Sequence, residues 1–134
     1  MRKAIFTAPL LALLAGLAVP TASVRSAEAP PELGTELMQA IDDSNKSLSS
    51  NISLKDAKAS ASDAREINQA FIQVEAYFAT RPDAADAVEL ARRTRELTDQ
   101  IVQSVGSGKF DAAADSATAL SRTCRTCHTF YKKS

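Results

Sequence analysis

The segment that decides the fold is residues 110–132, FDAAADSATALSRTCRTCHTFYK. Its apolar positions alternate by four and three residues, which is the spacing of a helix that packs along one seam of a bundle. These positions are Ala113, Ala117, Leu120, Cys124, Cys127 and Tyr131. The sequence therefore predicts a final helix over 110–132, whose inward face carries both cysteines and has His128 beside it.

Three further amphipathic segments precede this one, and the pattern predicts helices over about 32–50, 54–79 and 83–105. Ser53 is the expected N-cap of the second, with Asp56 three residues later in a capping-box spacing. Pro82 and the run Gly106-Ser107-Gly108 mark the two later turns. Four helices joined by short turns, with no alternating strand pattern, predict an all-α antiparallel four-helix bundle.

The run Cys124-Arg125-Thr126-Cys127-His128 has the spacing of a covalent attachment site for a c-type haem. Two thiols can form thioethers with the two vinyl groups of one haem, and the next residue can supply an imidazole nitrogen to the iron. On a helix, residues three and four apart share a face, so the three side chains can serve one group. We therefore expect one covalent haem c, held by Cys124 and Cys127 and ligated by His128, in the core of the bundle.

Other interpretations of the motif are weaker. A thioredoxin-like redox pair belongs to a strand–helix–strand context, and the segment before Cys124 is rich in alanine and helical in pattern. A zinc site takes about four ligands, whereas the chain has two cysteines and one histidine. A disulfide between positions three apart on a helix is geometrically awkward. A protein without haem, which uses the two thiols for disulfide exchange, remains an alternative hypothesis.

Residues 1–27 have the pattern of a secretory signal peptide, with Arg2 and Lys3 before an apolar run that ends at Pro20. The run is too short to span a membrane, so we expect an exported domain at 28–134, located in the periplasm, without stable membrane insertion. Removing the signal leaves 13 basic residues against 16 acidic residues, a net charge of −3 with histidine neutral. This balance argues against a nucleic-acid partner.

The signal sequence, four helices and one Cys-x-x-Cys-His motif near the C-terminus together resemble the cytochrome c-prime family, the class II cytochromes c. The stretches Gly108-Lys109-Phe110 and His128-Thr129-Phe130-Tyr131 resemble the beginning and end of that family's last helix. The resemblance implies a periplasmic haem protein. If a methionine of the first helix is the second iron ligand, the protein is an electron carrier, and Met38 lies about where that ligand would be. If the iron is five-coordinate, the protein binds NO or CO instead, and Met38 is a core residue.

The chain departs from the family at Gly34, where many members carry an arginine near a haem propionate. The resemblance also allows a homodimer formed through the first two helices. Basic residues around the motif are candidates for steering an acidic redox partner protein; they are Arg122, Arg125, Lys132 and Lys133. No nucleophile and base form a catalytic pattern, so we do not expect an enzyme.

Overall fold

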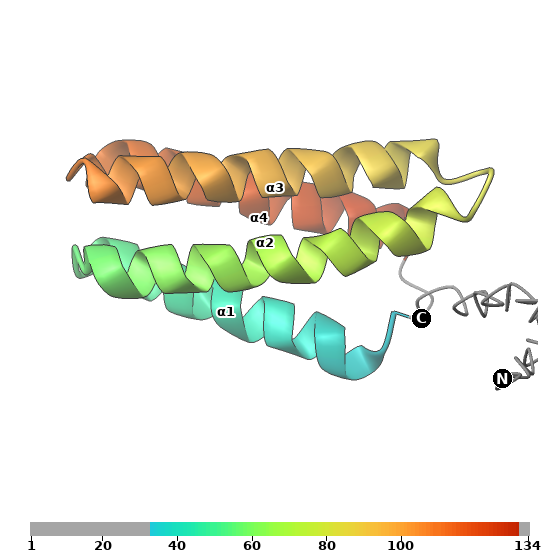
Figure 1. Ribbon diagram of the computed structural model, residues 1–134, viewed down its shortest axis with the longest axis horizontal. Helices are drawn as coiled ribbons and strands as arrows, with labels where there is room; N and C mark the ends of the chain where they lie inside the picture. Colours follow the sequence, from blue (N-terminus) through green and yellow to red (C-terminus); the bar gives the residue numbers. More distant parts are fainter. Residues whose placement is uncertain (1–32, 132–134) are drawn as a thin grey trace, which may run out of the picture.

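The computed structural model describes residues 33–131, which form four helices: α1 (Thr35–Ser53), α2 (Ala57–Ala79), α3 (Ala85–Gly106) and α4 (Phe110–Tyr131). Successive helices lie side by side and run in alternating directions, so the predicted all-helical arrangement is confirmed for this part of the chain (Figure 1). Contacts between α1 and α4 close the bundle. The predicted signal peptide, 1–27, lies outside the described residues.

Three predicted boundaries of the first two helices are wrong: both ends of the first, and the beginning of the second, which is Ala57 instead of 54. The first helix was expected over 32–50, but α1 begins at Thr35, after an extended Gly34, and continues to Ser53. Ser53 is therefore not an N-cap; its hydroxyl donates to the carbonyl of Ser49 (3.0 Å) inside α1. The cap of α2 is Asp56, whose carboxylate accepts from the backbone N–H of Ala59 (2.9 Å). A carboxylate caps a helix at least as well as a hydroxyl and also suits the positive end of the helix dipole.

The core has one large, fully buried side chain from each helix at its centre. These are Leu48, Ile67, Ile101 and Leu120, each 0% exposed. Alanines fill much of the remaining interior and let the helix backbones approach closely; the buried ones are Ala61, Ala64, Ala84, Ala87, Ala91, Ala113 and Ala117. The middle of the bundle is therefore packed by small and branched side chains that leave little freedom to shift one helix along another.

Polar contacts between α2 and α3 add to this packing. The carboxylate of Glu75 accepts from Arg92 Nε and from Arg95 Nη1, both at 2.9 Å. Although burial acts to raise the pKa of Glu75, the hydrogen bonds from the two arginines outweigh it and lower that pKa. The ion pair therefore favours the folded state where Glu75 is charged, and its contribution falls as the carboxylate is protonated in acid.

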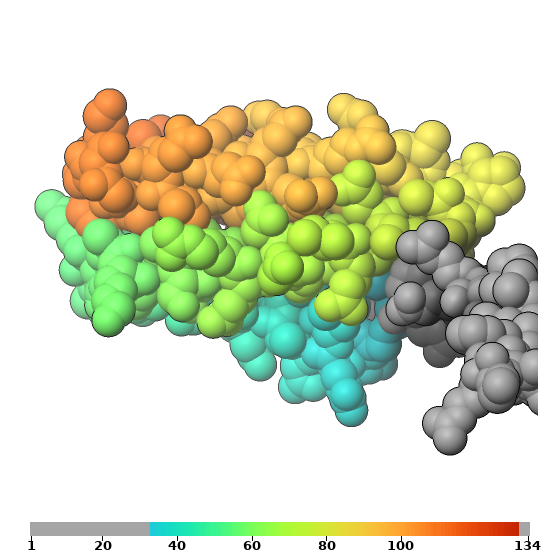
Figure 2. Space-filling model, in the orientation of Figure 1, coloured from blue at the N-terminus to red at the C-terminus, as the bar shows by residue number. Residues whose placement is uncertain are grey.

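Helix α1 packs closely against its neighbours in its second half and less closely towards its beginning. Its second half is joined to α2 by Asn51, which donates to Asp63 (2.7 Å), and to α4 by Asn45, which donates to Ser121 (3.4 Å). Towards its beginning α1 diverges from α2 and projects from the body of the bundle (Figures 1 and 2). The apolar side chains Leu37 and Met38 in that half are partly buried against the core.

Two isoleucines of α2 give a matched test of this core. Ile67→Ala should lower the free energy of unfolding by about 2–5 kcal/mol, because it removes a fully buried side chain. Ile72→Ala makes the same chemical change at a position that is 42% exposed, and should cost well under half as much. Urea denaturation of both variants measures the difference, and equal losses would contradict this assignment of the inner face.

Candidate functional site

The Cys-x-x-Cys-His motif lies in the last turns of α4, which continues as an unbroken helix to Tyr131. Cys124 and Cys127 are partly buried and pack against the core, which is the inward placement predicted from the seam. His128 is exposed. Thr126 and Thr129, on other faces of the helix, donate to the carbonyls of Arg122 and Arg125 (3.0 and 2.9 Å). The two thiols therefore lie on the inward face of α4, and the two threonine hydroxyls lie on other faces.

Both thiols lie in surroundings that keep them protonated. Burial raises the pKa of Cys124 to about 11, and the neighbouring Cys127 and the Asp42 carboxylate of α1 act in the same direction. Burial also raises the pKa of Cys127, with a further contribution from Asp86 of α3. Cysteines that exchange disulfides have a lowered pKa, because the thiolate is the nucleophile. These two therefore lack the electrostatic environment of a thiol–disulfide pair, and residues 33–131 contain no strand to supply the fold context of one.

The register of α1 against α4 sets where Met38 lies relative to the motif. The Asn45–Ser121 hydrogen bond pairs the two antiparallel helices. Met38 is seven residues before Asn45, and His128 is seven residues after Ser121. Seven residues are two helical turns, about 10 Å along the axis, with a drift of about 20° around it. Met38 and His128 are therefore level with each other, on the stripes of α1 and α4 that carry the pairing residues.

The pair Asp42 and Cys124 supports the same register. Asp42 is three residues before Asn45 and Cys124 is three residues after Ser121, and the carboxylate is near enough to influence the thiol. Within residues 33–131, no hydrogen bond joins Met38 to the motif. The position of Met38 follows from the register of α1 against α4 and from its packing against the core. The sequence indicated that Met38 lies on the first helix, but it could not show that Met38 lies at the same height along the bundle as His128.

An aromatic column closes the bundle beside the motif. The phenol of Tyr131 donates to Asp86 of α3, and its ring lies 5.0 Å from the ring of Phe78 on α2, centroid to centroid. Phe78 in turn meets the ring of Tyr77 edge-on, also at 5.0 Å. The guanidinium of Arg81 lies over Tyr77, 3.4 Å from the ring centroid. The spacing of apolar residues placed Tyr131 on the inward face of the last helix, but it did not bring Phe78, Asp86 or Arg81 to this end.

The donor groups of this region fit a covalently attached haem. Two thiols lie on the inner side of one helix, an imidazole lies one residue further on, and a thioether lies level with it on another helix. Thiols are the attachment groups, and imidazole and thioether are both established axial ligands of haem iron.

The basic residues expected to steer a partner are described only in part. Arg122 and Arg125 are exposed on α4, whereas Lys132 and Lys133 lie outside the described residues. Arg125 also borders a shallow hollow between α1 and α4, together with Ser49, Ser53 and Ser121. Neither arginine lies within 4 Å of a carboxylate in the described part of the chain. Their charges are therefore available to a partner surface.

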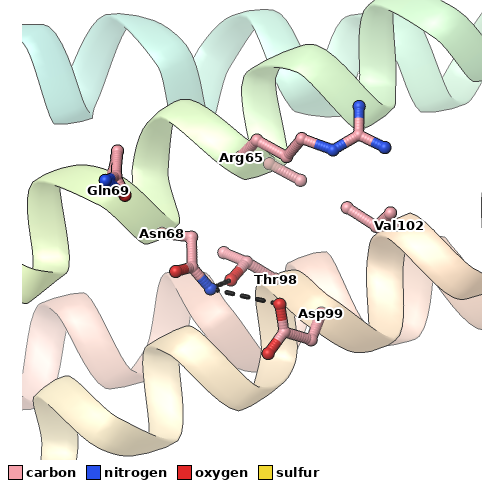
Figure 3. Close-up of a pocket in the computed structure, with 7 residues that line it drawn as sticks. Arg65, Asn68, Gln69, Thr98, Asp99 and Val102 are labelled. Carbon is pink, nitrogen blue, oxygen red and sulfur yellow. Dashed lines mark hydrogen bonds between the residues drawn. The ribbon is translucent and has the colours of Figure 1, made fainter.

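A second hollow lies between α2 and α3, away from the motif (Figure 3). Asn68 Nδ2 donates there to Thr98 Oγ1 (2.8 Å) and to Asp99 Oδ1 (3.2 Å). The Asn68 amide therefore joins the two helices across the hollow, and the hollow contains none of the site residues predicted from the sequence. We interpret it as a hydrogen-bonded seam between two helices.

Comparison with known protein families gave no match, and comparison with curated proteins and with solved structures gave no similar protein. Within residues 33–131, no helix combines the length and the apolar character that crossing a membrane requires. The function is therefore argued from the chain's own residues.

The Tyr131–Asp86 hydrogen bond generates a prediction that depends on pH. This bond raises the pKa of Tyr131 from 10.0 to about 12. A raised pKa means that the bond stabilises the folded state below pH 10 and that the effect is lost as the pH rises towards 12. Tyr131→Phe should therefore lower the urea midpoint at pH 8, and its difference from the parent should shrink as the pH rises above 10. Phe130→Leu, at an exposed position of the same helix, should change neither the midpoint nor its pH dependence.

Proposed function

We propose that this chain is a monohaem c-type cytochrome of the class II kind, acting in electron transfer in the periplasm. The observation that carries the proposal is the combination of motif and register. Cys124, Cys127 and His128 lie on the inner side and edge of the last helix of a four-helix bundle, and Met38 lies level with His128 on the first helix. Bound in the core, haem supplies one-electron exchange between ferric and ferrous iron.

The cysteines of the chain would hold that group covalently. Each thiol adds across one vinyl double bond: a carbon–sulfur bond forms, and the thiol proton passes to the other vinyl carbon. This addition is balanced without an oxidant, so it needs none at the site. Because the two cysteines are held in an unbroken helix and pack against the core, the attached group would be fixed inside the bundle rather than on its surface.

The iron ligands of the proposal are His128 and Met38. His128 follows Cys127 directly, so its imidazole would bind on the side of α4. Met38 projects from α1, where a soft thioether level with the imidazole can take the opposite position. Histidine and methionine together raise the reduction potential and fill both axial positions, which suits an electron carrier. The five-coordinate alternative, a protein that binds NO or CO, requires Met38 to be a packing residue only.

The partner would be another redox protein. Arg122 and Arg125 are exposed on the helix that carries the motif, so an acidic surface on the partner could be steered to this side by long-range attraction. Such encounters are short-lived and weaken with salt, which is what a carrier that must release its partner requires.

The first test is whether the chain carries haem at all. The protein should be produced with an active cytochrome c maturation system, and its haem content measured on a denaturing gel and by its pyridine haemochrome spectrum. We expect one haem per chain that remains attached after denaturation, and none in the Cys124→Ala/Cys127→Ala variant, which has no thiol to form a thioether. A colourless, folded parent protein would contradict the proposal and favour the thiol hypothesis.

The second test concerns Met38. The reduced holoprotein should show a sharp low-spin spectrum that CO does not change, because both axial positions are filled. Met38→Ala should convert it to a high-spin spectrum that shifts with CO, whereas Leu37→Ala, a partly buried neighbour on the same helix, should leave it low-spin. A high-spin, CO-sensitive parent would exclude Met38 as a ligand and favour the gas-binding alternative.

A further inference from the structure

Among residues 33–131, Arg81 is the one arginine or lysine in the segments that close the bundle beyond Arg125 of the motif. This end is formed by the beginning of α1, the end of α2, the beginning of α3 and the end of α4 (Figure 1). The segments involved are 33–42, 76–90 and 126–131, and Arg81 is the only arginine or lysine in them. Arg81 lies in the connection between α2 and α3, whereas the arginines of α3 lie further along the bundle and are each paired with a glutamate.

The guanidinium of Arg81 is held in a defined position. Its Nη1 donates to the carbonyl of Tyr77 (2.8 Å) and to Thr80 Oγ1 (3.3 Å), and its central carbon lies 3.4 Å from the centroid of the Tyr77 ring. Its Nε and Nη2 groups have no acceptor among residues 33–131. One edge of the guanidinium is anchored, and the N–H groups of the other edge can donate hydrogen bonds to a carboxylate. Binding a carboxylate there would cost little further side-chain freedom.

The aromatic column leads from Arg81 to the helix that carries the motif. Arg81 lies on Tyr77, Tyr77 touches Phe78, and Phe78 touches Tyr131. Tyr131 is three residues after His128, less than one helical turn away. Arg81 is therefore connected to the end of α4 through three packed rings, although it is far from the motif in the sequence.

The chemistry of haem brings a negative charge to this end. The two propionates of haem lie on the half of the ring opposite the two vinyl groups. Along α4 the thiol of Cys124 comes first and the imidazole of His128 follows, so a group fixed by both would extend from the thiols towards the C-terminal end of α4. Asp83 and Asp86 already add negative charge there, because both influence Tyr131. Two further carboxylates need a cation as a partner, and Gly34 on α1 supplies none.

We propose that Arg81, anchored on the ring of Tyr77, binds a propionate carboxylate of the attached haem. This inference rests on the proposed function. Arg81 acts as a positioning residue: it holds the carboxylate-bearing edge of the group and offsets the negative charge near the iron.

The test compares reduction potentials of the holoprotein, measured by spectroelectrochemistry at low salt. In Arg81→Gln the carboxylate loses its cation and favours ferric iron, so the ratio of reduced to oxidised protein at a fixed potential should fall severalfold. Arg81→Lys keeps the charge but loses the planar fork, and should recover part of the loss. Arg65→Gln removes an exposed arginine of α2 far from this end, and should leave the ratio unchanged.

Other outcomes overturn the inference. If haem is attached but Arg81→Gln and Arg65→Gln give the same potential, Arg81 does not bind the carboxylate, and the proposed function still stands. If Lys132→Gln/Lys133→Gln lowers the potential and Arg81→Gln does not, the partner lies in the C-terminal residues. A parent protein without haem would overturn the proposed function, and the role of Arg81 with it.

Discussion

The burial of one large side chain from each helix in a shared core is the constraint on which the rest of the structure depends. Leu48, Ile67, Ile101 and Leu120 are each fully enclosed, and the buried alanines of the same core let the backbones approach closely. In such tight packing, sliding one helix by a single turn would leave a cavity or force an overlap, and either is costly. The packing of this core therefore fixes the register of all four helices.

The register of α1 against α4 sets the positions of residues about two turns away from Asn45 and Ser121, where the motif lies. Once Asn45 is held opposite Ser121, Met38 and His128 must lie level with each other. The two ends of the bundle also differ in character. Alanine-rich packing holds the helices together in the middle, whereas α1 diverges from α2 towards its beginning, where Leu37 and Met38 are only partly buried. The motif lies at the end of the bundle where α1 diverges.

Electrostatics at this end point in the same direction. Burial keeps the two thiols protonated, which suits groups that become thioethers better than groups that exchange disulfides. Asp86 pairs with Tyr131, and Arg81 lies on Tyr77 with one edge open. The end of the bundle therefore combines packed aromatic rings with a few fixed charges.

The amino-acid sequence alone determined that residues 33–131 form four helices, and it predicted the chemistry of the motif. The spacing of four and three residues predicted α4 and the inward cysteines. Residues at this spacing share one face of an α-helix, so the pattern can be found within a single segment of the sequence. Capping was less certain, since Ser53 and Asp56 are both good caps and only the fold selects Asp56.

The tertiary structure decided what depends on several helices at once: the level of Met38 against His128, the Tyr131–Asp86 bond, and the place of Arg81 beside the motif. These follow from how side chains of distant segments fit together. Helical periodicity gives the face of a residue, but it carries no information about the height at which two helices meet.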